Sequence, residues 1–196
     1  MSRFILLLVV LLFLTPVFSQ DKGHISNFNF GLAVDPINLE VFDPCQLLPA
    51  DKVGGALQML PEYISVKPVG NLGEVKARSC FYKWEDADMP NTGMLLKLMT
   101  NPVYDDSPDF LLLTLNSKAQ NGEFVPGQKE KVKYKEAYIG KVKIVYSTQN
   151  VYWNIGNNYQ FFMAFNLPKI TEEQMLKFCH DLIPYINNQM IFKLLE

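Results

Sequence analysis

The chain has almost balanced charges and few charged residues, and each of these two properties excludes one class of protein. Its 196 residues include 18 Lys and Arg and 20 Asp and Glu, which gives a formal net charge of −2. A nucleic-acid-binding protein requires a strong basic excess, so we expect no nucleic-acid partner. Because 48% of the residues are hydrophobic and only 19% are charged, the chain is not an intrinsically disordered one.

The sequence also lacks the short motifs that hold catalytic or metal-binding groups in a fixed geometry. It contains no GxSxG, no HExxH, no phosphate-binding glycine loop and no CxxC. One of its two histidines, His24, lies near the N-terminus, and the other, His180, follows Cys179. Adjacent helical residues point about 100° apart, so Cys179 and His180 do not form a nucleophile and its base. We therefore expect no cofactor and no metal, and we favour a non-enzymatic protein.

The one long apolar run lies at the N-terminus, from Phe4 to Leu14, between a positively charged start and Thr15-Pro16. This pattern is typical of a secretory signal peptide, here residues 1–19 with cleavage after Ser19. An uncleaved membrane anchor is the alternative, but the run is shorter than the roughly 20 apolar residues that span a bilayer. We expect a secreted or periplasmic protein with no transmembrane segment after signal cleavage.

Three cysteines, an odd number, lie in this exported chain: Cys45, Cys80 and Cys179. Compartments outside the cytoplasm are oxidising, so a disulfide bond is expected. Cys179 shares one helical face with Met175, Leu182 and Ile186, which predicts a buried and inert thiol. We therefore pair Cys45 with Cys80, with Cys45–Cys179 as the alternative. Closing a loop of this length would stabilise the fold by roughly 3–4 kcal/mol.

Apolar periodicity and turn residues divide the chain after the signal peptide into an irregular N-terminal lead, residues 20–42, and one domain, residues 43–196. Helical segments are predicted at residues 43–60, 110–120 and from Thr171 onward, with Pro184 expected to kink the last helix or to end its regular part. Asp106 and Pro108 mark the start of the second helix. Strands are predicted at residues 63–69, 77–84, 94–100, 132–138, 141–147, 151–155 and 159–165.

The predicted order of elements is therefore α-βββ-α-ββββ-α. Short reversals between consecutive strands favour antiparallel pairing. The expected fold class is α+β, a mainly antiparallel sheet covered by helices.

Lysine recurs at every second position from Lys129 through Lys131 and Lys133 to Lys135. On the predicted strand these four side chains share one face. A solvated face that discourages edge-to-edge aggregation is the simpler interpretation. The functional alternative is a patch that docks an anionic surface or polymer, and it predicts salt-sensitive binding.

The last two predicted strands are rich in aromatic residues. Alternation assigns Tyr159, Phe161 and Phe165 to the core and Phe162 to the opposite face. Together with Tyr152, Phe162 is a candidate apolar contact for a partner or ligand. Coverage of these two side chains by the first or last helix is the simpler expectation.

Glu85-Asp86-Ala87-Asp88 is the one dense acidic cluster on a predicted loop. Carboxylate oxygens on a turn can bind calcium, but the spacing matches no established calcium loop. We interpret the cluster as a solvated turn.

The segment Asp43-Pro44-Cys45-Gln46-Leu47-Leu48, followed by Val53-Gly54-Gly55-Ala56-Leu57, resembles the opening of a bacterial exported lipoprotein family of unknown function. In that family a second cysteine comes about 35 residues later with an aromatic residue behind it, as in Cys80-Phe81-Tyr82. Pro126-Gly127 and Lys135-Glu136-Ala137-Tyr138 are similar to later parts of the pattern.

The chain departs from the family pattern at Pro49 and Lys52, and it has no lipidation cysteine behind the apolar run. The resemblance therefore carries over no lipid anchor. It implies a disulfide between Cys45 and Cys80, an α+β domain that faces the envelope, and no known catalytic residue.

These observations favour an exported, non-enzymatic binding or accessory domain. Its partner would be an unknown protein or small ligand in the cell envelope or the medium. Two alternatives are a small secreted hydrolase, with carboxylates drawn from Glu85, Asp86 and Asp88, and a structural protein that self-associates.

Overall fold

The computed structural model describes residues 39–69, 76–86, 89–125, 127, 129–166 and 170–196. The predicted signal peptide, His24 and most of the N-terminal lead lie outside these residues. No helix in the described part of the chain combines the length and the apolarity that a membrane crossing requires.

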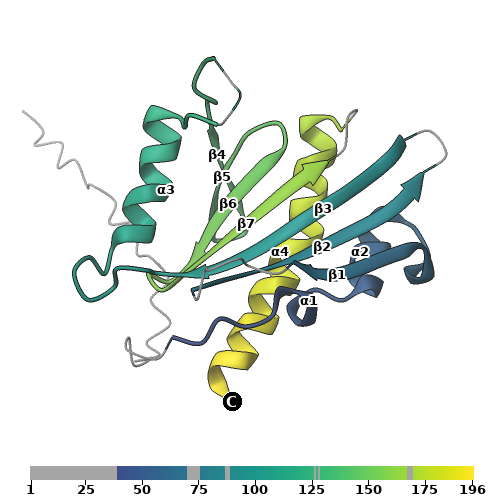
Figure 1. The fold of residues 1–196 in the computed structure, drawn as a ribbon, viewed down its shortest axis with the longest axis horizontal. Coiled ribbons are helices and arrows are strands. Elements are labelled where there is room, and N and C mark those ends of the chain that lie inside the picture. The colour runs from purple at the N-terminus through teal and green to yellow at the C-terminus, as the bar shows by residue number, and fades with distance from the viewer. Residues whose placement is uncertain (1–38, 70–75, 87–88, 126, 128, 167–169) are drawn as a thin grey trace, which may run out of the picture.

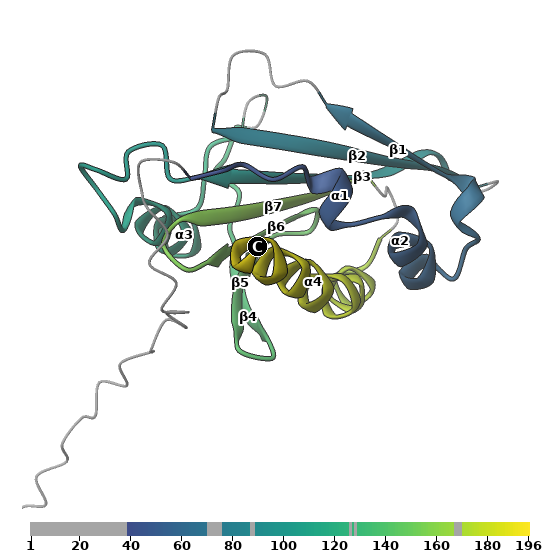
Figure 2. The ribbon, with the colours of Figure 1, turned by 90° about the horizontal axis from the view of Figure 1, so that it is seen from below.

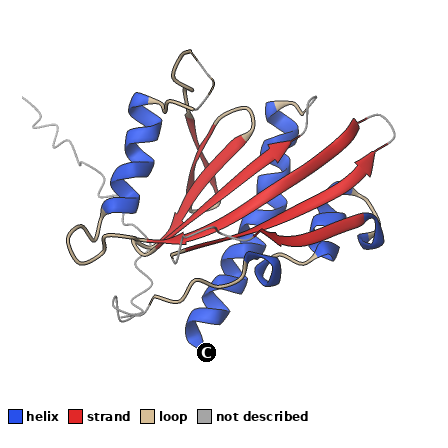
Figure 3. Ribbon diagram, viewed as in Figure 1, coloured by secondary structure: helices blue, strands red, loops and turns tan. Residues whose placement is uncertain are grey.

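A single antiparallel sheet organises the described residues, with the strand order β1-β2-β3-β7-β6-β5-β4 (Figure 3). This arrangement confirms the predicted α+β class and its succession of strands. The strands are β1 Ile64–Val69, β2 Ala77–Asp86, β3 Met89–Thr100, β4 Lys135–Ile139, β5 Val142–Tyr146, β6 Asn150–Ile155 and β7 Tyr159–Asn166.

The helices divide unequally between the two faces of the sheet. Three of them, α1 Pro44–Leu47, α2 Ala50–Leu57 and α4 Glu172–Leu195, lie on one side of it, which we call the core face (Figures 1 and 2). The main core forms there, where sheet residues such as Trp153 and Phe161 pack with Ile183 of α4. The opposite, outer face carries α3, Phe110–Asn121, which packs through Leu115 on Val145 and Tyr152.

Local sequence signals explain where most helices begin and end. The Asp43 side chain accepts a hydrogen bond from the Cys45 amide at 2.9 Å, so the predicted cap of the first helix is confirmed. Pro49 then divides the predicted segment into α1 and α2, because proline fits best at a helix start. Thr171 and Gln174 form a reciprocal capping box at the start of α4.

The predicted run of the second helix, residues 110–120, matches α3, but the expected start signals at Asp106 and Pro108 lie before the helix, and its N-cap, Asp109, makes no side-chain capping bond. Of the two outcomes expected at Pro184, an end of the last helix is wrong, since α4 continues to Leu195. Proline removes one backbone donor, but buried Ile183, Ile186 and Met190 hold this part of the helix on the core.

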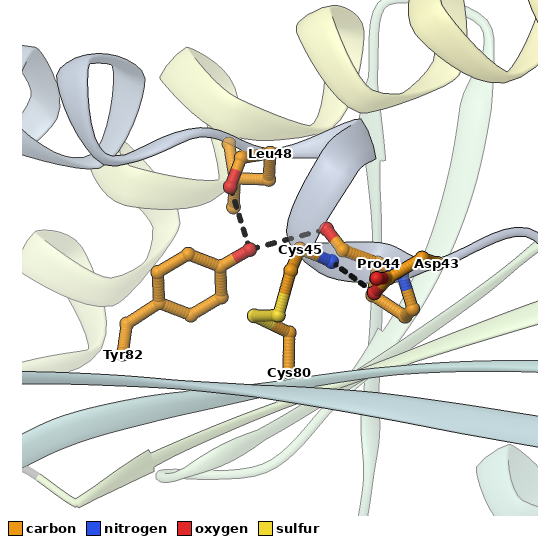
Figure 4. Close-up of a disulfide and its surroundings, with 6 residues drawn as sticks. All are labelled: Asp43, Pro44, Cys45, Leu48, Cys80 and Tyr82. Atoms are coloured by element: carbon orange, nitrogen blue, oxygen red, sulfur yellow. Dashed lines mark hydrogen bonds between the residues drawn. A yellow bond between two sulfur atoms is a disulfide. The ribbon is translucent and has the colours of Figure 1, made fainter. Parts of the chain in front are cut away.

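A disulfide joins α1 to β2 on the core face (Figure 4). It links Cys45 and Cys80, whose Cα atoms are 5.2 Å apart, so the predicted pairing is confirmed and the alternative with Cys179 is wrong. The Tyr82 hydroxyl donates to the Leu48 carbonyl oxygen at 2.6 Å and lies 3.2 Å from that of Pro44. Cys179 is free and buried, and burial raises the pKa of its thiol to about 12, as expected of an inert group.

Candidate functional site

The sheet separates between β5 and β6, and this separation creates the candidate site. Within the described sheet, the two strands pair at Ile144–Trp153, Val145–Tyr152 and Tyr146–Val151 and at no further position. Continuing the register would place Lys143 opposite Asn154 and Val142 opposite Ile155. The two strands part at these positions, while Val142 and Lys143 keep their pairing with β4 and Asn154 and Ile155 keep theirs with β7.

The hairpin of β4 and β5 leaves the plane of the sheet at this point. It turns through Gly140, whose φ of 59° suits glycine. Figures 1 and 2 both place the hairpin between α3 and α4, and Figure 2 shows it bending toward the side on which α4 lies. The splayed strands and the two helices therefore surround one space at this end of the sheet.

That space is a cleft with a volume of about 400 Å³. Its apolar lining comes from all of the surrounding elements: Leu112 and Leu115 of α3, Ile139 and Val142 of the hairpin, Ile155 of β6, and Pro184 and Ile191 of α4. Its polar lining includes four asparagines, which are Asn154, Asn157, Asn187 and Asn188. Clefts of this size with a few polar groups in an apolar lining are typical sites for small molecules.

Asn154 is the polar residue of this lining whose hydrogen bonds are incomplete. Its Oδ1 accepts from Gln160 Nε2 at 3.0 Å. Its Nδ2 is buried, and among the described residues it has no hydrogen-bond partner. A buried donor without a partner costs about 1–3 kcal/mol, so a ligand acceptor at this wall would recover free energy that the fold alone loses.

Hydrogen bonds and an ion pair join the walls of the cleft. Asn187 Oδ1 accepts from the indole Nε1 of Trp153 at 3.0 Å, which ties α4 to β6. Lys143 Nζ lies 2.7 Å from Glu136 Oε1 and donates to Asn116 Oδ1 at 3.2 Å, which ties the hairpin to α3. These bonds tie α4 to β6 and the hairpin to α3, and so hold the walls of the cleft in place.

The four lysines of the predicted patch do not share a strand. All four are exposed, but β4 begins only at Lys135, and Lys129, Lys131 and Lys133 precede it. The expectation of one strand face is therefore wrong, since the chain there makes only an isolated bridge between Glu123 and Val132. Lys135 Nζ also lies 2.6 Å from Glu172 Oε2, so its charge is locally balanced.

Tyr152 and Phe162 lie side by side on the outer face, with ring centroids 4.6 Å apart. Both are half-buried. The helix that packs against Tyr152 is α3, so the expected cover by the first or last helix is wrong. Lys118 Nζ of α3 lies 4.5 Å from the centroid of the Tyr152 ring and forms an ion pair with Glu123.

The acidic cluster shows no convergence in the described part of the chain. Glu85 is exposed at the end of β2, while the side chain of Asp86 and all of Asp88 lie outside the described residues. Among the described residues, no three His, Cys, Asp or Glu side chains gather in a way that would hold a metal ion.

Buried tyrosines make the fold sensitive to alkali. Burial raises the pKa of Tyr134 to about 12, with the hydrogen bond to Glu123 as a smaller cause, and burial likewise raises that of Tyr159 to about 12. Burial also raises the pKa values of Tyr82 and Tyr152, with charge repulsion as a further cause. Unfolded tyrosines ionise near 10, so these groups stabilise the fold below that pH and cease to do so as pH rises above it.

We therefore expect the free energy of unfolding to fall steadily above pH 10. The measurement is a titration of tyrosinate absorbance for the folded and the urea-unfolded protein. The folded protein should show a fraction of its nine tyrosines that ionises only at higher pH or on unfolding. Coincident titration curves would contradict the burial described above.

Comparison with family models, with curated proteins and with solved structures finds no match to this chain. The cleft and its residues therefore carry the functional argument.

Proposed function

We propose that this chain is an exported binding protein that holds one small, mostly apolar molecule in the cleft between α3, α4 and the hairpin of β4 and β5. The observation that carries the proposal is the buried Asn154 Nδ2, which lacks a partner among the described residues at the wall of a mostly apolar cleft. A ligand with an apolar body and one carbonyl, carboxylate or sulfonate oxygen matches this lining. Such an oxygen would satisfy the amide after a small rotation of its side chain.

Export and a non-enzymatic role are parts of the same proposal. The apolar run from Phe4 to Leu14 supports a signal peptide, and the Cys45–Cys80 disulfide fits an oxidising compartment. The DPCxLL segment with its second cysteine supports kinship with an exported family that faces the bacterial envelope. The cleft residues favour binding over catalysis, because the described lining lacks a Ser, Cys or His nucleophile or base.

The test uses anilinonaphthalene sulfonate, an aromatic probe with sulfonate oxygens whose fluorescence rises in apolar sites. We expect saturable binding by the mature protein, because the cleft offers apolar walls and a rotated Asn154 amide would donate to a ligand oxygen. Leu112→Trp places an indole in the cleft and should weaken binding about tenfold or more, a loss of about 1.4 kcal/mol. The measurement is a fluorescence titration at equal protein concentration.

A neighbouring position on α3 supplies the control. Leu113 is 59% exposed and does not line the cleft, so Leu113→Trp should leave probe binding unchanged. The α4 side offers a second pair, with Ile191→Trp expected to weaken binding and Phe192→Trp, at a position 63% exposed, expected to leave it intact. Equal affinity of all four variants and the parent would refute the site, as would failure of the parent to bind.

A further inference from the structure

The chain between α3 and β4 forms a loop that is separate from the cleft, and the base of this loop is firmly held. Glu123 and Val132 pair there through two backbone hydrogen bonds, of 3.1 Å and 2.8 Å. Gly122 lies so close to the base that an added Cβ would come 2.5 Å from the Val132 carbonyl oxygen. The Tyr134 hydroxyl donates to Glu123 at 3.0 Å, and Lys118 of α3 forms an ion pair with the same carboxylate. These contacts anchor the loop on α3.

The loop presents a large apolar side chain to solvent directly beyond its base. Phe124 is 67% exposed, more than any other large apolar side chain of the described residues. In Figure 1 the loop projects beyond the end of α3. A single exposed phenylalanine is ordinary on a protein surface, so the groups around Phe124 decide what it suits.

Three exposed lysines share the loop with Phe124: Lys129, Lys131 and Lys133. None of the three forms an ion pair with another described residue. The Nζ atom of Lys131 lies 5.2 Å from the centroid of the Phe124 ring, so a cation and the aromatic ring are presented together. We call Phe124 and the three lysines the basic tip.

The acidic groups near the basic tip do not neutralise it. The elements that pack beside the loop, α3, β5 and β6, contain no acidic residue. The nearest carboxylates on the base, on β4 and at the start of α4 each have a lysine partner: Glu123–Lys118, Glu136–Lys143 and Glu172–Lys135. Glu173 lies with α4 on the core face, whereas the loop is anchored on α3. On the loop itself, Glu130 is the one unpaired carboxylate among the described residues, against three unpaired lysines.

This combination favours a lipid surface over other occupants. Lysines near anionic headgroups strengthen membrane binding, and a protruding aromatic ring can enter the boundary between headgroups and acyl chains. A soluble polyanion would engage the lysines but leave Phe124 in water. A second copy of the chain would bring lysine against lysine, and one aromatic side chain offers far less area than the roughly 800 Å² per partner of a stable interface.

We propose that the basic tip binds the surface of a bilayer that contains anionic phospholipids. Phe124 lies at the boundary between headgroups and acyl chains, and the three lysines lie at the headgroup phosphates. Each lysine near such a surface strengthens binding only about fivefold, so the binding is reversible and weakens as salt is added. The proposal stands independently of the cleft, because no residue of the basic tip lines it.

The test is sedimentation of the mature protein with vesicles made of equal parts of phosphatidylglycerol and phosphatidylcholine, at low ionic strength. The bound fraction is measured against lipid concentration. We expect Phe124→Ser and Lys131→Glu each to raise the lipid concentration for half-maximal binding about fivefold or more. Vesicles of phosphatidylcholine alone should bind the parent far more weakly, as should the mixed vesicles at high salt.

Matched controls come from exposed residues elsewhere on the molecule. Lys67 is an exposed lysine on β1, at the opposite edge of the sheet from β4, and Phe192 is 63% exposed near the end of α4. Lys67→Glu and Phe192→Ser make the same chemical changes as the two test variants and should bind like the parent. Equal thermal unfolding of all four variants shows that a loss of binding is not a loss of fold.

Three results would overturn the proposal. The first is equal binding by the parent, Phe124→Ser and Lys131→Glu, or no binding of the parent to the anionic vesicles. The second is an equal loss in Lys67→Glu, which would make total charge, rather than the basic tip, the cause of binding. The third is a loss in Lys131→Glu but not in Phe124→Ser, together with equally tight binding to dextran sulfate, which would assign the lysines to a soluble polyanion.

Discussion

Removal of the Cys45–Cys80 disulfide should lower the free energy of unfolding by about 3–4 kcal/mol. The bond closes a loop between residues 35 apart in sequence, and its loss returns that loop's conformational freedom to the unfolded chain. Urea unfolding of the Cys45→Ala, Cys80→Ala double variant measures the effect. Because Cys80 is fully buried and the Tyr82 hydroxyl holds α1 nearby, we expect the variant to fold with α1 still in place.

Cys179 provides the control for this prediction. It is free and equally buried, so Cys179→Ala loses a small side chain and no covalent bond. Its cost should be clearly smaller than that of the double variant. Reductant should destabilise the parent and Cys179→Ala but leave the double variant unaffected. A double variant as stable as the parent would contradict the structural role of the bond.

Truncation of Trp153 should cost about 3–5 kcal/mol, as for other large buried aromatic side chains. Trp153 is fully buried and stacks on Phe161 with ring centroids 5.0 Å apart. Its indole also donates to Asn187 of α4, so Trp153→Ala removes both the packing and the link that holds one wall of the cleft. Urea unfolding measures the stability, and the probe titration measures the cleft in the same variant.

Trp153→Phe separates the two contributions. It retains an aromatic ring against Phe161 but removes the donor to Asn187, leaving that acceptor without its partner. Loss of the hydrogen bond alone should cost about 1–3 kcal/mol, and the smaller ring adds a further packing cost. The phenylalanine variant should therefore lie between the parent and Trp153→Ala. Equal stability of Trp153→Ala and the parent would show that α4 does not depend on this contact.

Sequence patterns predicted most of the helices and strands, because alternation and helix capping depend on residues that are close together in the sequence. Alternation of aromatic residues identified β7, where Tyr159, Phe161 and Phe165 are all buried as expected. Thr171 identified the start of α4, and the shared face of Met175 and Cys179 identified its buried side. The cysteine pairing could also be predicted, because the helix position of Cys179 and the expected oxidising compartment left few choices.

The errors arose where tertiary contacts decide the outcome. Lysine alternation suggested a strand through Lys129–Lys135, but only the residues from Lys135 onward find a partner in β5. Pro184 suggested a kink or an end of the last helix, and packing of the following turns keeps α4 helical beyond it. Intrinsic preference is a weak guide wherever pairing or burial overrides it.

The candidate site could not have been predicted from the sequence. It depends on the separation of β5 from β6, and neither strand contains a residue that predicts this separation. Asn154 looks like an ordinary polar residue on an alternating strand, and Asn187-Asn188 like polar residues near a helix end. Only the arrangement in space places them in one cleft with residues from α3 and the hairpin.

The most direct test of the cleft is to locate the bound probe by NMR. Backbone amide shifts of the isotopically labelled mature protein would be recorded with and without saturating anilinonaphthalene sulfonate. The proposed site predicts that the largest changes cluster in residues 138–143, 154–157 and 187–191, which surround the cleft. Largest changes at Phe81, Leu95 and Phe162 would place the probe on the outer face of the sheet instead and contradict the cleft as the ligand site.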